Sequence, residues 1–201
     1  MPEEHAFLSA SGAHRWINCT PSAALEKQFP DTAGSYAAEG TLAHSLAELK
    51  LRKQFEVMKL SAYKQRLAEI QSDELYQREM DGYTDAYVDY IRSLCMASAG
   101  TQYVVVEKRL DFSQIVPGGF GTGDCVILYD DTLHIVDLKY GKGVAVSAEN
   151  NPQLRLYALG AVQEYSLLYT IRQVQMHIVQ PRLDNISTDS LTADELQQWG
   201  E

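Results

Sequence analysis

Apolar residues in the first half of the chain recur at helical spacing. Leu42, Leu46 and Leu49 form one stripe of a helix predicted over about 41–55, because residues three or four apart share a helix face. The opposite face of that helix carries His44, Glu48, Leu51 and Phe55. A helix with apolar side chains on two faces is expected to lie between two other layers of the protein.

Two more helices are predicted before the first strand. Residues 58–72 are polar and basic, and residues 72–97 form a longer helix. Tyr83, Tyr87 and Tyr90 on the longer helix have the spacing of core aromatics, which we favour over a strip that stacks nucleobases. Earlier in the chain we expect a short helical segment at 11–18 and a loop at 30–36.

The second half of the chain is typical of strands. Runs rich in β-branched residues predict strands at 102–110, 126–129, 133–139 and 172–180. The turn Asp130–Asp131 joins the second strand to the third, and helices are predicted at 152–164, where Pro152 suits the first turn, and at 192–201. The order helix, strand, strand, strand, helix, strand, with an extra helical region at about 56–98, indicates one α/β domain over residues 1–201.

The composition of the chain argues against a membrane protein and a secreted protein. The 201 residues are 45% hydrophobic and 22% charged, which is ordinary for a soluble globular protein. No apolar run approaches the length of a membrane span, and the first residues do not resemble a signal peptide, so we expect a cytoplasmic protein that does not contact membranes.

Charge argues against a broad nucleic-acid surface. The net charge is −10, whereas phosphate contacts dominate nucleic-acid affinity. A local basic groove is still expected if the chain binds DNA. Its candidate members are Arg52, Lys53, Lys59, Lys64, Arg66, Lys139, Lys142 and Arg155.

The candidate chemistry lies in the predicted hairpin. Asp137 and Lys139 are two apart on a strand and therefore share a face, while Leu138 points away into the core. Asp124 begins the partner strand and can approach Asp137. Two carboxylates this close call for a cation, and oxygen ligands suit Mg²⁺ or Mn²⁺. Ordinary solvated charges explain Asp130 well but explain Asp137 and Lys139 poorly, because these interrupt an apolar strand.

Several motifs, in order along residues 8–157, resemble those of the PD-(D/E)XK nuclease superfamily in its RecB-like branch. Gly123–Asp124 followed by Asp137-Leu138-Lys139 resembles the nuclease signature, and Gln153 with Tyr157 resembles the QxxxY helix motif. The segments 39–44, Glu-Gly-Thr-Leu-Ala-His, and 8–21, with Ser9, Ser11 and Cys19, resemble the branch's upstream motifs, except that Thr20 stands before the proline. The chain also resembles a prophage-borne family of unassigned function related to CRISPR-associated RecB-like exonucleases.

The resemblance implies a restriction-endonuclease-like αβββαβ core, with a mixed central sheet flanked by helices. It implies a Mg²⁺- or Mn²⁺-dependent, exonuclease-like deoxyribonuclease that acts in phage or prophage DNA processing or recombination within a bacterial cytoplasm. Asp124, Asp137, the Leu138 carbonyl and His44 would hold the metal, and Lys139 would orient the attacking water. The implied partners are linear or single-stranded DNA ends, and a second copy of the chain or a phage recombination protein.

Several roles stay open on the sequence. His44 and Glu48 are four apart and could simply bond to each other; the resemblance favours a site role for His44, whereas Glu48 remains a candidate neighbour of the site. Glu107 is either a further acidic site residue or a strand-end charge paired with Lys108 or Arg109. Gln153 and Tyr157 either position DNA, as the resemblance implies, or in the case of Tyr157 only pack the helix on the sheet. The alternative to an enzyme is a catalytically silent module that binds DNA ends or protein.

The cysteines argue against a disulfide framework, because Cys19, Cys95 and Cys125 are odd in number and far apart. Relatives in the resembled branch carry an iron–sulfur cluster that needs four thiolates, one of them from the position of Cys19. No cysteine follows Cys125. We therefore expect no cluster in this chain and a free thiol at Cys19, with Cys95 and Cys125 as core residues.

Overall fold

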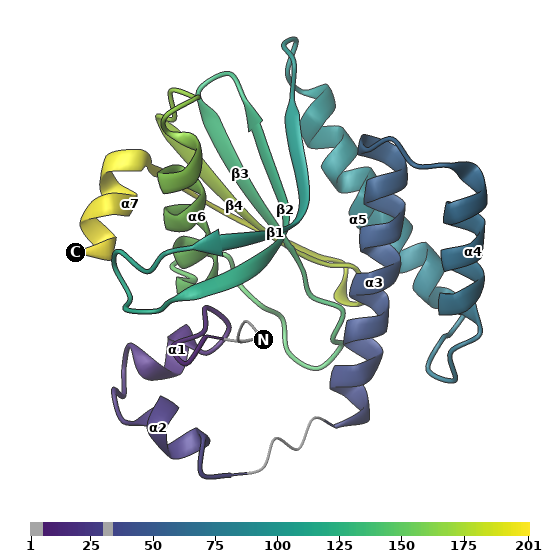
Figure 1. Ribbon diagram of the computed structural model, residues 1–201, viewed down its shortest axis with the longest axis horizontal. Coiled ribbons are helices and arrows are strands. Elements are labelled where there is room, and N and C mark those ends of the chain that lie inside the picture. Colours follow the sequence, from purple (N-terminus) through teal and green to yellow (C-terminus); the bar gives the residue numbers. More distant parts are fainter. Residues whose placement is uncertain (1–5, 30–33) are drawn as a thin grey trace.

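The computed structural model describes residues 6–29 and 34–201 and shows an α/β fold (Figure 1). Its helices are α1 (Ala13–Trp16), α2 (Ser22–Glu26), α3 (Ser35–Phe55), α4 (Leu60–Gln71), α5 (Glu79–Met96), α6 (Pro152–Tyr165), the 3₁₀ helix η1 (Pro181–Leu183) and α7 (Ala193–Gly200). Its strands are β1 (Tyr103–Asp111), β2 (Phe120–Tyr129), β3 (Thr132–Leu138), β4 (Gln173–Gln180) and β5 (Asn185–Thr192).

The strands form one mixed sheet in the order β1-β2-β3-β4-β5. Neighbouring strands are antiparallel except for β3 and β4, which are parallel and are connected through α6. The expected mixed sheet flanked by helices is therefore confirmed as an α/β architecture.

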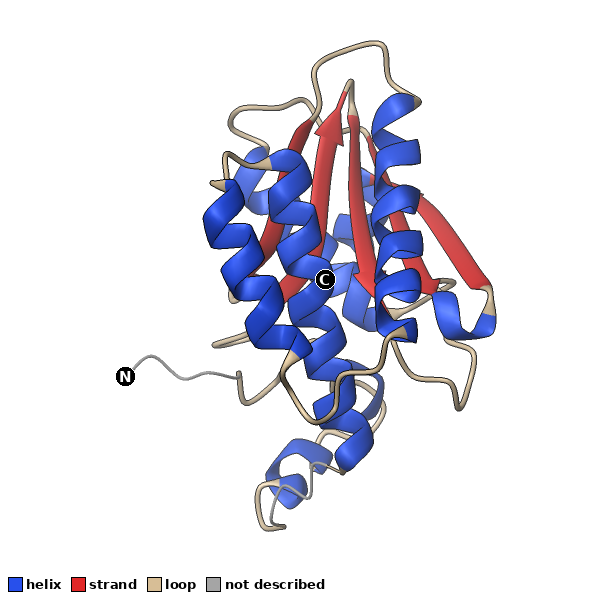
Figure 2. Ribbon diagram, turned by 90° about the vertical axis from the view of Figure 1, so that its right-hand side faces the viewer, coloured by secondary structure: helices blue, strands red, loops and turns tan. Residues whose placement is uncertain are grey.

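The two faces of the sheet bury different helices. One face packs on α6, with Leu154 and Ala158 among the buried residues. The other face packs on α3 and α5, which Figure 2 shows in front of the sheet together with α4. Leu46 and Leu49 of α3 face α4, whereas Leu51 faces the sheet. The prediction that this helix lies between two layers is confirmed.

The predicted hairpin and the helix after it form as expected. Asp130 in the turn between β2 and β3 takes a left-handed conformation, with φ of 53°, which Asp tolerates better than most residues. Asn151 caps α6 by accepting hydrogen bonds from the backbone N–H groups of Gln153 and Leu154, and Pro152 occupies the first turn.

Other boundaries differ from the prediction. The helix expected from residue 72 begins only at Glu79, because Asp73 accepts a hydrogen bond from the Leu75 N–H in a local turn. The helix α3 begins at Ser35, ahead of the expected residue 41, so the end of the expected 30–36 loop is helical, while residues 30–33 lie outside the described part.

The strand β5 was not predicted. Its inward positions carry polar residues that hydrogen-bond rather than an apolar stripe: Ser187 accepts from the Ala148 N–H, and Asp189 accepts from the Asn150 N–H. The edge strand therefore has the composition of a loop.

The tyrosines of α5 and two of the cysteines pack in or against the core. Tyr87 is fully buried and donates to the Val136 carbonyl, and Tyr83 packs edge-on against Tyr140. The tyrosines of α5 are thus packing residues. Cys95 and Cys125 are buried core residues, as predicted, and Cys19 is exposed. Among the described residues, no helix combines the length and apolar character that crossing a bilayer requires.

Candidate metal centre

The two aspartates meet where β2 and β3 separate. The pairing of these strands runs from Tyr129–Thr132 to Cys125–Val136, so Asp124 and Asp137 are the next opposed positions. Asp124 Oδ2 accepts a hydrogen bond of 2.7 Å from the Leu138 N–H, which ties the two strands together beyond their last paired residues. Asp137 is almost fully buried at this point.

Lys139 and the helix α6 complete this side of the site. Lys139 Nζ lies 2.8 Å from Asp137 Oδ2 and donates to Gln153 Oε1 at 3.0 Å. Gln153 Nε2 donates to Asp137 Oδ1 at 3.4 Å and to the Tyr157 hydroxyl at 3.2 Å. The predicted shared face of Asp137 with Lys139, and of Gln153 with Tyr157, is confirmed.

The helix α3 brings His44 to the other side of Asp124. His44 Nδ1 lies 3.3 Å from Asp124 Oδ1. Glu48 does not bond to His44; its carboxylate accepts from Arg52 at 2.8 Å, with the residues four apart on α3. The interpretation of His44 and Glu48 as a mutual pair is therefore wrong, although both line one small recess beside Asp124 and Glu107.

Glu107 does not end its strand, as the sequence suggested, but lies inside β1 in a left-handed conformation, with φ of 51°. The pairing of β1 with β2 omits only Glu107, which stands opposite Asp124. The suggested pairing of Glu107 with Lys108 is also wrong, because Lys108 pairs with Glu164 at 2.5 Å.

The left-handed residue coincides with a change of face in β1. Val104 and Val106 pack towards α3 and α5, but Leu110 packs in the cluster around α6, although all are separated by even numbers of residues. The strand therefore changes face between Val106 and Leu110, around Glu107.

This change of face is what brings Glu107 towards α3. One ligand atom each from His44, Glu107 and Asp124 lies within 4.8 Å of the others. Asp137 is not part of this group; it faces Lys139 and Gln153 instead. The sequence left the role of Glu107 open, and the structure places its carboxylate beside Asp124.

The charges at the site are strongly coupled. Burial lowers the pKa of His44, but the attraction and hydrogen bond of Asp124 outweigh it and raise that pKa to about 9. Burial, followed by repulsion from Asp124 and Glu48, raises the pKa of Glu107 to about 7. Burial also raises the pKa of Asp137, against the attraction of Lys139. The pKa of Lys139 rises as well, because Asp137 outweighs the effect of burial, so Lys139 stays an ammonium group.

These residues fit a divalent cation by their chemistry. One imidazole nitrogen and two carboxylates are ligands that Mn²⁺ accepts, and Mg²⁺ accepts the carboxylates. Ligands of one such ion, each at about 2.1 Å from it, lie at most about 4.2 Å apart. The atoms of His44, Glu107 and Asp124 therefore need only small movements to share an ion.

The predicted basic groove is mostly absent from the described surface. Arg52 pairs with Glu48 and Glu56, and Arg66 pairs with Glu69. Arg155 is buried and bonds to Asn150 and Asp189, so its assignment to a groove is wrong. Lys53, Lys59, Lys64 and Lys142 remain exposed, and Lys139 lies within the site itself.

Two features of the site escaped the sequence analysis. Gln180 is buried at the end of β4, where its amide donates to the Gly141 and Val144 carbonyls and accepts from the Val146 N–H. It thereby holds the segment that follows Lys139. Nothing in the sequence distinguishes this glutamine from a surface one. The second feature is the conformation of Glu107, which no propensity predicts.

The glycines near Asp124 have a clear role. A Cβ at Gly121 would lie 2.6 Å from Cε1 of Tyr157, so only glycine allows α6 to approach β2 this closely. Cys125 lies behind the site in the core, as predicted.

A family model described as "Protein of unknown function (DUF2800)" matches residues 5–201. The match includes every residue of the site and both layers of helices. The chain therefore belongs to the DUF2800 family.

Proposed function

We propose that this protein is a metal-dependent DNA nuclease, exonuclease-like in action, with a PD-(D/E)XK core of the RecB-like type. The observation that carries the proposal is the convergence of Asp124, Asp137 and Lys139 where β2 and β3 separate, with His44 approaching from α3. A structural hairpin has no need of an ammonium group and two carboxylates at a point where burial makes charge costly.

His44, Glu107 and Asp124 would hold the metal. Asp137 and the Leu138 carbonyl, on the adjoining strand, are further proposed ligands, although Asp137 contacts Lys139 and Gln153 here. A divalent cation bound there would make a water molecule more acidic and would neutralise charge on a phosphate group. We propose Mn²⁺ or Mg²⁺, and the imidazole favours Mn²⁺.

Lys139 acts as a donor rather than as a base, because its pKa is raised and it remains charged. Asp137 and Gln153 fix its Nζ from two directions, so the remaining N–H can orient the attacking water or a phosphate oxygen. In hydrolysis the water oxygen bonds to phosphorus as the P–O bond to the leaving sugar breaks, and the leaving oxygen takes up a proton.

Gln153 and Tyr157 are positioning residues in this proposal. Gln153 contacts both Asp137 and Lys139, and Tyr157 orients Gln153 from the next turn of α6. Tyr157 also packs α6 on the sheet, where its ring lies against Gly121. The proposed setting is DNA processing or recombination by a phage or prophage, in the cytoplasm of its bacterial host.

The test is a cleavage assay on linear and circular DNA, both single- and double-stranded, with Mn²⁺, Mg²⁺ or a chelator. We expect shortening of linear DNA with Mn²⁺ or Mg²⁺ and none with the chelator. Cleavage of circles would replace the exonuclease assignment with an endonuclease one.

The alternative is a catalytically silent DNA-end or protein-binding module, which the net charge of −10 and the paired basic residues favour. Metal-dependent DNA binding without any cleavage would establish that alternative. If the chain neither cleaves nor binds DNA, the nuclease proposal has no support.

A further inference from the structure

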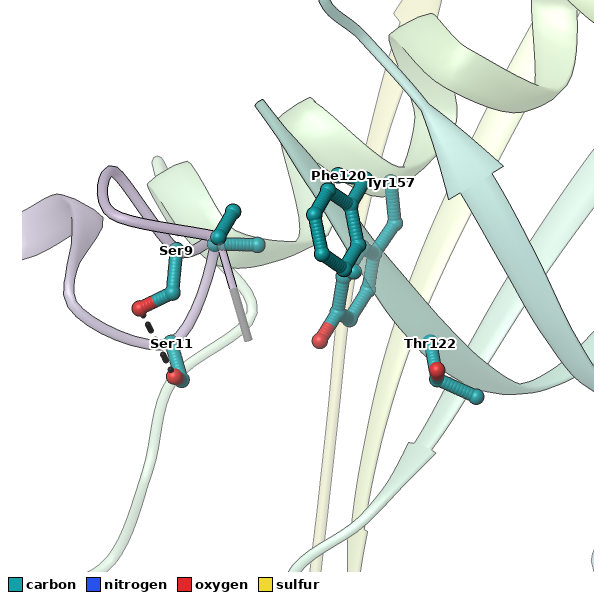
Figure 3. A pocket seen from close by; sticks show the side chains of 8 residues that line it. Ser9, Ser11, Phe120, Thr122 and Tyr157 are labelled. Atoms are coloured by element: carbon teal, nitrogen blue, oxygen red, sulfur yellow. Dashed lines mark hydrogen bonds between the residues drawn. The ribbon is translucent and has the colours of Figure 1, made fainter. Parts of the chain in front are cut away.

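A cavity of about 200 Å³ lies beside the site and has no role in the chemistry described above. The N-terminal segment Ser9-Ala10-Ser11 forms one wall, and Phe120, Thr122 and Tyr157 form the others. Figure 3 shows the Ser9 and Ser11 hydroxyls on one side, the Phe120 and Tyr157 rings in the middle and Thr122 on the other side. The serine motif near residue 9, which stood out in the sequence, therefore lines a cavity.

We propose that this cavity binds one phosphodiester unit of a single DNA strand, next to the nucleotide held at the metal centre. The inference rests on the proposed nuclease function and deepens it by naming how the strand is held.

The lining has the chemistry of a phosphate and sugar site. It presents the hydroxyls of Ser9, Ser11, Thr122 and Tyr157, and no carboxylate is among the residues that form it. Hydroxyl groups donate to phosphate oxygens without a formal charge. In a chain of net charge −10, a cavity walled by donors and free of carboxylates is a place where a phosphate meets little local repulsion.

The aromatic wall suits the rest of a nucleotide. Phe120 is half-exposed beside the cavity, and the Arg109 guanidinium lies 3.5 Å from the centroid of its ring. Arg109 is not among the residues that line the cavity, and its charge also acts on the neighbouring Asp111 carboxylate. Stacking on an aromatic ring is the common way to hold an unpaired nucleotide without reading its sequence.

The serine wall is held in place before any ligand binds. Ala10 and Ala13 are buried in the core beneath it. Trp16 Nε1 donates to the Ser9 carbonyl at 2.9 Å, and Ser9 Oγ accepts from the Gly12 N–H. Ser9 Oγ and Ser11 Oγ lie 3.3 Å apart, which leaves a hydroxyl hydrogen able to turn towards a ligand. A wall anchored in this way costs little entropy when it binds.

The cavity is connected to the metal centre through residues that touch both. The Tyr157 hydroxyl lines the cavity and accepts from Gln153, which contacts Lys139 and Asp137. Thr122 precedes Asp124 by two residues, or about 7 Å along an extended strand. That spacing is on the scale of one nucleotide. A second cavity of about 260 Å³ lies on the other side of Ser11 and reaches Gln153, so the serine segment has space on both sides.

The volume also limits what can bind. Cavities for drug-sized ligands are larger, at roughly 300–1,000 Å³. A cavity of about 200 Å³ suits one sugar–phosphate unit and excludes a duplex. A strand that reaches both this cavity and the metal must therefore be single at this point.

The test uses the full chain with Ca²⁺, which we use to hold the DNA without cleavage. Fluorescence anisotropy measures the affinity for a short single-stranded oligonucleotide labelled internally. We expect the double variant Ser11→Ala/Thr122→Val to bind at least about tenfold more weakly, since bonds to charged groups are the stronger ones. The matched control Ser61→Ala/Thr101→Val removes the same two groups at exposed positions and should bind like the wild type. Ca²⁺ affinity should be unchanged in both.

Equal oligonucleotide affinity in the Ser11/Thr122 variant and the wild type would overturn the assignment of the cavity, and metal-dependent cleavage by that variant would leave the proposed function intact. A second measurement separates the two hypotheses if the chain neither cuts nor binds oligonucleotides. The dinucleoside phosphate TpT is then titrated into ¹⁵N-labelled protein. Shifts centred on the Ser9, Ser11 and Thr122 amides would support the cavity without the nuclease, and their absence would overturn it.

The same titration distinguishes two sources of phosphate. TpT carries only an internal phosphodiester, whereas pT carries only a terminal phosphate. Shifts with TpT support the proposal. Shifts with pT alone would overturn it, because the ligand would then be a strand end rather than an internal unit.

Discussion

Two buried polar clusters include residues of β3: one at the carboxyl end of this strand, which we call the charged end, and one nearer the β2–β3 turn, which we call the neutral end. At one end, Asp137 faces Lys139 and Gln153 beside Asp124. At the other, His134 Nδ1 lies 3.1 Å from Nε2 of His177, whose Nδ1 is 2.9 Å from the Tyr90 hydroxyl. His134 also stacks on Tyr129. Each cluster mixes side chains that proteins seldom bury.

The difference between the clusters is in charge. Burial lowers the pKa of His134 to about 4, and burial together with His134 lowers that of His177 to about 3, so both rings are neutral at pH 7. The carboxylate end instead keeps a charged lysine and raises the pKa of His44.

The backbone differs too. Glu107 at the carboxylate end is left-handed, whereas neither histidine has a positive φ. The proposed site therefore differs from the histidine pair in its retained charge and in its backbone conformation, and not in the burial of polar groups.

The largest effect is expected when a single side chain is removed from the charged end. We expect Asp137→Ala and Lys139→Ala each to lower DNA cleavage by about a thousandfold or more, since each would contribute to stabilising the transition state. Metal-free stability should not fall in Asp137→Ala, because burial already makes the charged carboxylate unfavourable.

The matched change at the neutral end is His134→Phe, which preserves a ring against Tyr129. It should leave the cleavage rate per folded molecule unchanged. Steady-state rates, with circular dichroism as a check of folding, decide the matter. Wild-type activity in Asp137→Ala or Lys139→Ala would remove that residue from the proposed machinery.

Lowering the pH should reduce the contribution of the neutral end to folding stability by several kcal/mol. The pKa values of His134 and His177 are lowered from 6.5 in the unfolded chain to about 4 and about 3, so the unfolded state takes up protons first. Their contribution to stability is complete above pH 6.5 and is lost as the pH falls towards 4. Each unit of pKa shift corresponds to about 1.4 kcal/mol.

Glu107 has the opposite effect on folding stability over the same pH range. Its pKa is raised to about 7, so the folded state takes up this proton first and is stabilised as the pH falls. The measurement is therefore a difference: denaturant unfolding of the wild type and of His134→Phe/His177→Leu from pH 7.5 to 5. The stability advantage of the wild type over the variant should shrink as the pH falls. An advantage that is constant with pH would show that the histidines are not buried as neutral groups.

The neutral end and the charged end were not equally visible in the sequence. Asp137 and Lys139 stand out because they interrupt an apolar strand, and the period of two places them on one face. The capping residue Asn151 and Pro152 likewise mark the start of α6 locally. Local rules therefore predict the hairpin, the helix after it and most of the site.

What the sequence did not predict depends on contacts between distant segments. The strand β5 has polar inward residues because Ser187 and Asp189 bond to the backbone near residues 148–150. His134 and His177 are 43 residues apart and pair only because β3 and β4 run in parallel. Glu107 joins the site only through its left-handed conformation. None of these leaves a pattern that can be seen within one segment.

Metal affinity should depend on pH through the charged end alone. A metal ligand must lose its proton, and the metal-free pKa values are about 9 for His44 and about 7 for Glu107. Mn²⁺ affinity should therefore rise about tenfold per pH unit between 7 and 9, and more steeply below 7. Calorimetry in buffers of different ionisation enthalpy counts the protons released. His44→Gln should remove the dependence between pH 7 and 9, and a slope that survives in that variant would exclude His44 as a ligand.

The smallest expected effect tests the backbone at the charged end. A left-handed conformation costs a residue with a Cβ about 1–2 kcal/mol, a cost that glycine avoids. At ordinary strand positions glycine is less stable than alanine by roughly 0.5–1 kcal/mol. At position 107 the order should reverse, so that Glu107→Gly is more stable than Glu107→Ala by about 1 kcal/mol.

The control is the pair Arg109→Gly and Arg109→Ala, at an exposed position of β1 with an ordinary φ, which should show the usual order. Chemical denaturation of the metal-free variants measures both differences. The same order at both positions would mean that Glu107 is not strained, and the contrast in backbone conformation between the charged end and the neutral end would no longer hold.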